Sequence, residues 1–162
     1  MMSESLVAYF SATNTTKRIA QRLAGLMHAD IYEICPQVPY RREDLNWMDK
    51  TSRSTLEMKD PSSRPKIIDQ KINLNKYSTI YLGFPIWWYT APAIIRTFLE
   101  SYDFNGKTII VFATLGGSGL GNTVNELSNL AKGASFIEGG ILQENAGDEQ
   151  LKHWIEEINR RR

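Results

Sequence analysis

Residues 6–16, LVAYFSATNTT, join a short apolar run to a loop of hydroxyl and amide side chains. The run 6–10 has no polar interruption, which is typical of a strand buried on both faces of a sheet. Over residues 15–27, apolar side chains recur at positions 19, 23, 26 and 27, with the period of an amphipathic helix. The segment therefore predicts a strand, a polar loop and a helix in succession.

Strand-sized apolar runs alternate with helical patterns along the rest of the chain. Further strands are predicted at residues 31–35, 79–84, 108–114 and 134–137, the last resuming after a glycine pair. Helices are predicted from Pro92, around residues 124–131, and from Asp148, which can cap the last one. This alternation indicates an α/β fold: a five-stranded parallel sheet, covered by helices on both faces, with right-handed crossovers.

The length and charge of the chain exclude several classes of protein. Its 162 residues fit one domain, spanning 1–162. Lys and Arg number 19 against 18 Asp and Glu, a net charge of +1, which argues against nucleic-acid binding because that affinity needs surplus cations. The single Cys35 excludes an internal disulfide and a cysteine-based zinc site, so we expect no metal.

No apolar stretch reaches the roughly 20 residues needed to span a bilayer. The N-terminus lacks the basic flank and long apolar core of a signal peptide. We therefore expect a cytoplasmic protein with no membrane partner, a compartment where a lone free thiol is unremarkable.

The segment 36–66 interrupts the alternation, because it is polar and holds four of the six prolines. We expect a surface helix somewhere within 41–59, since a structureless loop of that length is unusual in a compact domain. Two interpretations stay open. The helix either replaces an ordinary crossover as part of a second layer or forms a flap over a ligand site.

Ligands of open parallel sheets bind outside the carboxyl ends of the strands, so the loops that follow the strands are informative. The first loop offers the hydroxyls of Ser11, Thr13, Thr15 and Thr16 and the amide of Asn14. With the free N–H groups of a helix start they suit a phosphate, although an ordinary N-cap needs one such residue. No Walker A or G-x-G-x-x-G pattern is present in this loop.

The loops after the third and fourth strands suit a flat ring. The third-strand loop, residues 85–92, reads PIWWYTAP and carries three successive aromatics, which suggest a platform for a planar ligand. Alternatively, these aromatics pack against the segment 36–66 or form a homodimer interface. The fourth-strand loop, residues 115–121, reads LGGSGLG, and its four glycines let backbone approach a ligand closely. Phosphate cradle, aromatic ledge and glycine loop together fit flavin mononucleotide (FMN).

On these residues the chain resembles the flavodoxin-like superfamily, in particular short flavodoxin-domain flavoproteins whose ring loop reads P-x-W-W. The resemblance extends to the segment 36–66, where Arg53, Glu57, Asp60, Arg64 and Pro65 look like that subgroup's insert. It implies a flavodoxin-like three-layer αβα sandwich with strand order 2-1-3-4-5. It also implies FMN as the cofactor, bound where the chain switches between the first and third strands.

The resemblance also assigns the cofactor contacts. Phosphate contacts are implied for Ser11, Thr13, Asn14, Thr15 and Thr16, and ring contacts for Pro85, Ile86, Trp87 and Trp88 on one side and Thr114, Leu115, Gly116, Gly117 and Ser118 along the other. Asn14 stands where the family pattern has glycine. Asparagine is the non-glycine residue that best tolerates a left-handed φ, so the turn can survive.

The three loops contain no Asp or Glu, unlike the acidic surroundings of flavin in the electron carriers. We therefore expect an FMN-dependent oxidoreductase that passes electrons from NAD(P)H to a small quinone-like or other acceptor, with no side-chain catalytic residue. The alternative is a flavodoxin-type electron carrier between redox proteins. Arg41, Arg42, Arg53 and Arg64 could reach a nicotinamide nucleotide phosphate or a neighbouring subunit.

Overall fold

Five parallel strands form one sheet in the order β2-β1-β3-β4-β5 in this computed structural model, which describes residues 4–114 and 119–161. The strands are β1 (Glu4–Tyr9), β2 (Asp30–Glu33), β3 (Tyr77–Pro85), β4 (Thr108–Thr114) and β5 (Ser135–Ile141). The α/β class and the strand order 2-1-3-4-5 predicted from the sequence are thus confirmed.

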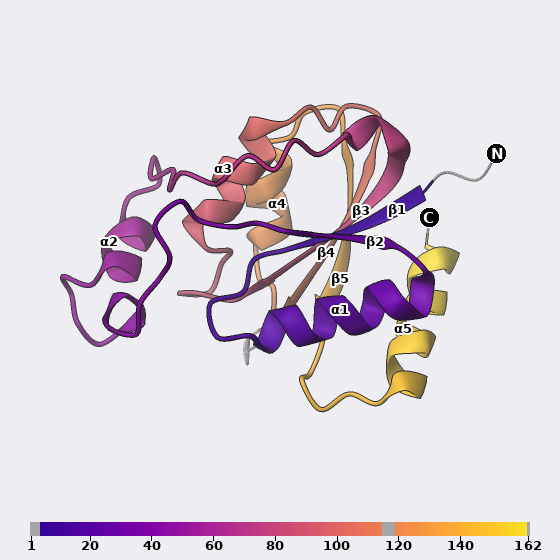
Figure 1. The fold of residues 1–162 in the computed structure, drawn as a ribbon, viewed down its shortest axis with the longest axis horizontal. Helices are drawn as coiled ribbons and strands as arrows, with labels where there is room; N and C mark the ends of the chain where they lie inside the picture. The colour runs from indigo at the N-terminus through magenta and orange to yellow at the C-terminus, as the bar shows by residue number, and fades with distance from the viewer. Residues whose placement is uncertain (1–3, 115–118, 162) are drawn as a thin grey trace.

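Helices cover both faces of the sheet (Figure 1). On one face α1 (Thr15–Met27) lies beside α5 (Asp148–Arg160), and on the other lie α3 (Ala93–Ser101) and α4 (Thr123–Ser128). Leu6 belongs to the core cluster under α3 and α4, whereas its neighbour Val7 belongs to the cluster under α1 and α5. Both neighbours must be apolar because successive strand residues point to opposite faces, which explains the uninterrupted run in β1.

Two strands differ in their limits from the sequence prediction. β2 ends at Glu33, before the predicted residue 35, although the Ile34 N–H still donates to the Tyr9 carbonyl (2.7 Å). β5 continues unbroken through the glycine pair because its register with β4 shifts by one residue there, and Gly140 takes a φ of 87°. The bulge absorbs the extra residue, so the expected interruption does not occur.

The helix starts also differ by one residue. Pro92 lies at the N-cap and α3 begins at Ala93. Asp148 is the first residue of α5 and is not its cap, so that prediction was wrong. The N–H of the preceding Gly147 donates to Gln150 Oε1 (2.8 Å), and the Asp148 carboxylate instead accepts from Arg22 (2.8 Å). The helix start is therefore closed by a side chain from within the helix.

Residues 36–66, called the insert below, leave the sheet after β2 and return before β3. Its base is closed where the Gln37 N–H donates to the Lys66 carbonyl (2.9 Å) and the Ile68 N–H donates to the Cys35 carbonyl (2.8 Å). It contains a 3₁₀ turn, η1 (Glu43–Leu45), and α2 (Arg53–Lys59), within the predicted range; η2 (Leu74–Lys76) follows it. Figure 1 shows α2 beyond the end of the sheet where β1 runs into the loop before α1.

No helix in the described ranges is long and apolar enough to cross a membrane.

Candidate functional site

The loop between β1 and α1 takes the left-handed turn that the sequence predicts for Asn14. Asn14 has a φ of 70°, and its carbonyl accepts from the Arg18 N–H (3.1 Å) in the first turn of α1. Thr13 and Asn14 are exposed, while Thr15 and Thr16 are buried. Thr13 and Asn14 are therefore accessible directly before the N-terminus of α1, a position that suits an anion.

Thr16 and Thr114 meet in the interior below this loop. Their side-chain oxygens lie 2.7 Å apart, and the two residues are 1% and 0% exposed. The bond joins the first turn of α1 to the end of β4, across 98 residues of sequence. Both residues were predicted to contact the cofactor. In the structure their hydroxyls bond to each other and hold the loop after β1 beside the end of β4.

The Ser11 hydroxyl, unlike those of Thr16 and Thr114, lacks a partner in the described part of the chain. Its oxygen is buried and has no hydrogen-bond partner among the described residues. Buried hydroxyls are usually hydrogen-bonded, so an orphan at a proposed phosphate loop fits an absent acceptor. Ser11 also lines a cavity of about 360 Å³ with Phe10, Cys35 and Tyr40, at the base of the insert. These features fit a bound phosphate-bearing ligand at the end of β1.

The loop after β3 is a tight hairpin turn. The Trp87 N–H donates to the Thr90 carbonyl (2.9 Å), and the Thr90 N–H donates to the Trp87 carbonyl (3.1 Å). Trp88 and Tyr89 between them have φ values of 49° and 67°, the left-handed pair of a type I′ turn. Bulky residues in this conformation store roughly 1–3 kcal/mol each, and such strain gathers at ligand sites.

The three aromatics of this turn divide into two groups. Trp87 packs edge-on against Phe10 (5.7 Å between ring centroids) and Tyr40 (5.4 Å), so it contacts the insert, as the alternative interpretation proposed. Trp88 and Tyr89 are 39% and 77% exposed. Ile86 is half-buried and Pro85 is buried at the end of β3. The exposure of Trp88 therefore allows the predicted contact with a ring, which stays a prediction for Pro85, Ile86 and Trp87 as well.

Tyr40 holds the insert against the ring loop, a role that the sequence analysis missed. The Arg53 guanidinium lies 3.8 Å from the centre of its ring, and its hydroxyl donates to Glu57 (2.5 Å). Burial, and then the bond to Glu57, raises the pKa of Tyr40. The signal in the sequence was that Tyr40 is one of two aromatic residues in the insert, the other being Trp47. The insert is thus part of the wall of the site.

The glycine loop is described only from Gly119 onward. The predicted ring contacts Leu115, Gly116, Gly117 and Ser118 lie outside the described residues. Gly119 and Gly121 have φ values of 79° and 54°, which glycine adopts without strain. The backbone freedom expected of this loop is therefore used in its second half.

The fold brings charged groups to loops that carry none in sequence. The Thr90 hydroxyl donates to Glu126 of α4 (3.1 Å), and Glu33 lines the cavity beside Ser11. Arg96 of α3 lies beside Thr90 at a second cavity. Neither Glu126 nor Arg96 was identified from the sequence, because both lie on helices whose approach to the ring loop depends on tertiary packing. In the described ranges there is no group of three or more side chains suited to a metal ion.

The sheet order and the loops at its carboxyl end define a flavodoxin-like protein. The flavodoxin family model matches residues 4–158, and the chain belongs to this family. Membership supports FMN as the cofactor, with which the orphan Ser11 hydroxyl and the turn at Asn14 agree.

Two similar solved structures come from Bacteroides. A candidate flavoprotein from Bacteroides eggerthii is 42% identical over 98% of this chain and 99% of its own, with a TM-score of 0.90. One from Bacteroides uniformis is 45% identical over 96% of this chain and 99% of its own, with a TM-score of 0.87.

A more distant flavoprotein from Lactobacillus acidophilus, crystallised in complex with FMN, is 19% identical over 95% of this chain and 99% of its own, with a TM-score of 0.70. This likeness shows a shared fold. Among curated proteins none matches the chain.

Proposed function

We propose that this protein is an FMN-dependent oxidoreductase that passes electrons from NAD(P)H to a small quinone-like acceptor. Family membership and the FMN complex of the Lactobacillus relative support the cofactor. When bound, FMN supplies two-electron chemistry with a nicotinamide donor and electron transfer to an acceptor. The protein supplies binding, orientation and the local charge.

The loop residues divide this task among them. Ser11, Thr13 and Asn14 hold the phosphate, helped by the free N–H groups at the start of α1. Trp88 and Ile86 offer apolar surface to one side of the ring, while the buried Thr16–Thr114 bond keeps the phosphate loop and the end of β4 at a fixed separation. No side chain needs to act as a general acid or base.

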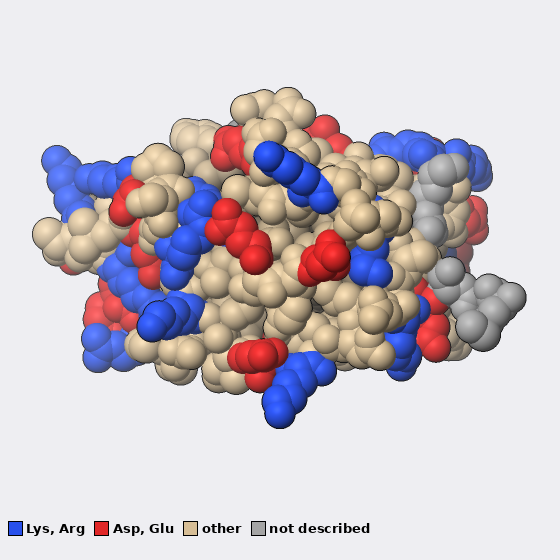
Figure 2. Space-filling view, turned by 90° about the horizontal axis from the view of Figure 1, so that it is seen from above, with Lys and Arg blue, Asp and Glu red and all other residues tan. Residues whose placement is uncertain are grey.

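The absence of Asp and Glu from the three loops favours an enzyme over an electron carrier. Negative charge near a flavin makes its reduction harder. The three loops themselves contain no Asp or Glu, and the acids that the fold brings beside them are Glu126, bonded to Thr90, and Glu33, in the cavity beside Ser11. We therefore expect a potential less negative than that of a carrier whose acids lie in the loops. Figure 2 shows acidic and basic side chains interspersed on the face it presents, without the large single-sign surface that steers a carrier to its partners.

One observation favours the carrier. Trp88 and Tyr89 are exposed at the proposed ring edge, where a docked redox protein could take electrons directly. The two functions differ in the potentials and in the donor. An enzyme shows close one-electron potentials and rapid reduction by NADH or NADPH in a stopped-flow experiment, whereas a carrier shows widely separated potentials and no reduction by either nucleotide.

FMN binding is tested first, through the orphan hydroxyl. Ser11→Ala removes one hydrogen bond to a charged group, so we expect the Kd for FMN to rise by about 10-fold or more. Ser54→Ala is the matched control, because Ser54 Oγ is also buried without a partner among the described residues but belongs to α2. Failure of the wild-type protein to take up added FMN would refute both redox functions.

A further inference from the structure

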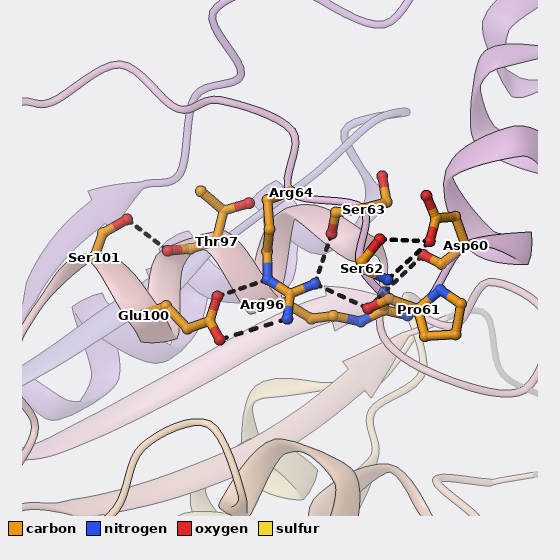
Figure 3. A network of polar contacts seen from close by, with 9 residues as sticks. All are labelled: Asp60, Pro61, Ser62, Ser63, Arg64, Arg96, Thr97, Glu100 and Ser101. Atoms are coloured by element: carbon orange, nitrogen blue, oxygen red, sulfur yellow. Dashed lines mark hydrogen bonds and ion pairs between the residues drawn. The ribbon is translucent and has the colours of Figure 1, made fainter.

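Two arginines lie side by side between the insert and α3 (Figure 3). Nη1 of Arg64 and Nη1 of Arg96 both donate to the carbonyl of Pro61, at 2.9 and 3.0 Å. Glu100 accepts from Nε and Nη2 of Arg64, at 2.6 and 3.4 Å. The carboxylate is therefore engaged by Arg64, which also donates to the Ser63 carbonyl (2.8 Å) and anchors the end of the insert.

Arg96 is the less satisfied of the two. Its Nη1 donates to the carbonyls of Asp60 (3.3 Å) and Pro61, but Nε and Nη2 have no acceptor among the described residues. No carboxylate of the described chain lies within ion-pair distance of it, and the residue is half-buried. Burial, and then the neighbouring Arg64, lowers the pKa of Arg96. The side chain thus holds a partly desolvated cation with unused donors.

A cavity of about 190 Å³ opens beside this cation and reaches the ring loop. Its polar walls are Arg64, Arg96, Thr90 and Glu126, and its apolar walls are Pro61, Ala91, Leu127 and Leu130. The cavity has room for several waters, which is enough for one phosphate or carboxylate group. It would therefore take one end of a larger molecule.

We propose that Arg96 binds a phosphate or carboxylate group of the redox substrate in this cavity, next to the ring loop. The inference rests on the proposed function and adds to it the charge class of the substrate. A guanidinium with Nε and Nη2 free presents the two parallel donors that bind such anions in bidentate fashion. Glu126 lines the same cavity and opposes any bound anion, so removing its charge should strengthen binding.

The first experiment measures anion binding without turnover. Inorganic phosphate is titrated by calorimetry into the FMN-loaded protein, in which the cofactor's own phosphate occupies the loop after β1. We expect saturable binding that weakens about 10-fold in Arg96→Gln, through loss of charge-assisted hydrogen bonds. It should strengthen in Glu126→Gln and stay unchanged in Arg160→Gln, a matched loss of charge on α5.

Weaker binding in Arg96→Gln with stronger binding in Glu126→Gln cannot result from a general loss of fold. An unchanged thermal midpoint of both variants checks the same point. Phosphate binding that is equal in wild type and Arg96→Gln would overturn the inference, as would phosphate that does not bind at all.

The second experiment distinguishes the source of the anion. If the anion is a phosphate of the donor, Arg96→Gln raises the KM for NADPH or NADH. A change in the ratio of these two KM values points to the 2′-phosphate, which NADPH alone carries. If it is a carboxylate of the acceptor, the KM for a carboxylated quinone rises, while that for a neutral quinone does not. Turnover with unchanged KM for all four substrates refutes the inference and leaves the proposed function standing. Arg96-dependent phosphate binding without turnover supports the anion site and refutes both the enzyme and the assignment of that site to a redox substrate.

Discussion

The buried bond between Thr16 and Thr114 gives a sharp test of how the two loops are held. Replacing either residue with valine leaves the other hydroxyl in a position that water cannot reach, since the residues are 1% and 0% exposed. An unsatisfied buried hydroxyl costs about 1–3 kcal/mol, whereas replacing both partners is close to neutral. Each single variant should therefore lose ~1–3 kcal/mol of unfolding free energy, and the double variant should recover most of it.

The assay is urea denaturation of the FMN-free protein, with the slope of the transition checked to be equal in all four proteins. For a chain of this size, a loss of 1 kcal/mol lowers the melting temperature by roughly 2–4 °C, so thermal scans give a second readout. A double variant as unstable as the sum of the two single ones would show no coupling, and would refute the assignment of this bond as a clamp between α1 and β4.

Three further predictions concern single positions. Gly83→Ala should cost about 1–3 kcal/mol, because a Cβ there would overlap the buried Phe112 ring, whereas Gly25→Ala, with nothing within 4 Å, should gain about 0.5–1 kcal/mol in urea melts. Asn14→Ala should lose about 1 kcal/mol in the same melts through its positive φ, while Asn14→Gly should not; equal stabilities would contradict the strain. Burial, and then its bond to a carboxylate of β2, raises the pKa of Tyr77 to about 12, so its stabilisation is complete below pH 10 and is lost as the pH rises to 12. Urea midpoints measured over that range should fall more steeply for wild type than for Tyr77→Phe.

The five-stranded parallel sheet could be predicted because each strand carries its own signal, whereas the order of its strands came from the family resemblance. The run at residues 6–10 is apolar throughout since Leu6 and Val7 enter different core clusters, and the periodicity of α1 is local as well. The ends of strands and helices were less predictable where contacts with other segments decide them. The bulge of β5 depends on its register with β4, and the start of α5 depends on a side chain reaching back to Gly147.

The candidate site shows the same division. The left-handed turn at Asn14 could be predicted because asparagine tolerates a positive φ. The polar loop after β1 could be recognised from its hydroxyl and amide side chains. The sequence could not decide which of the aromatics contacts the insert, because the insert folds back over the ring loop from a distant part of the chain and places Tyr40 against Trp87. The sequence left that alternative open, and the structure shows it for one tryptophan of the pair, while Trp88 stays exposed.

By itself, the sequence determined the class of fold, the hydroxyl loop after β1 and the absence of acids from the three loops, because propensity, periodicity and composition act within a few residues of each other. The tertiary structure alone decided that Thr16 bonds to Thr114 and that Arg96 and Arg64 both donate to the Pro61 carbonyl. These arrangements join segments tens of residues apart. They exist because packing of helices on the sheet, and closure of the insert at its base, bring the groups within hydrogen-bond distance.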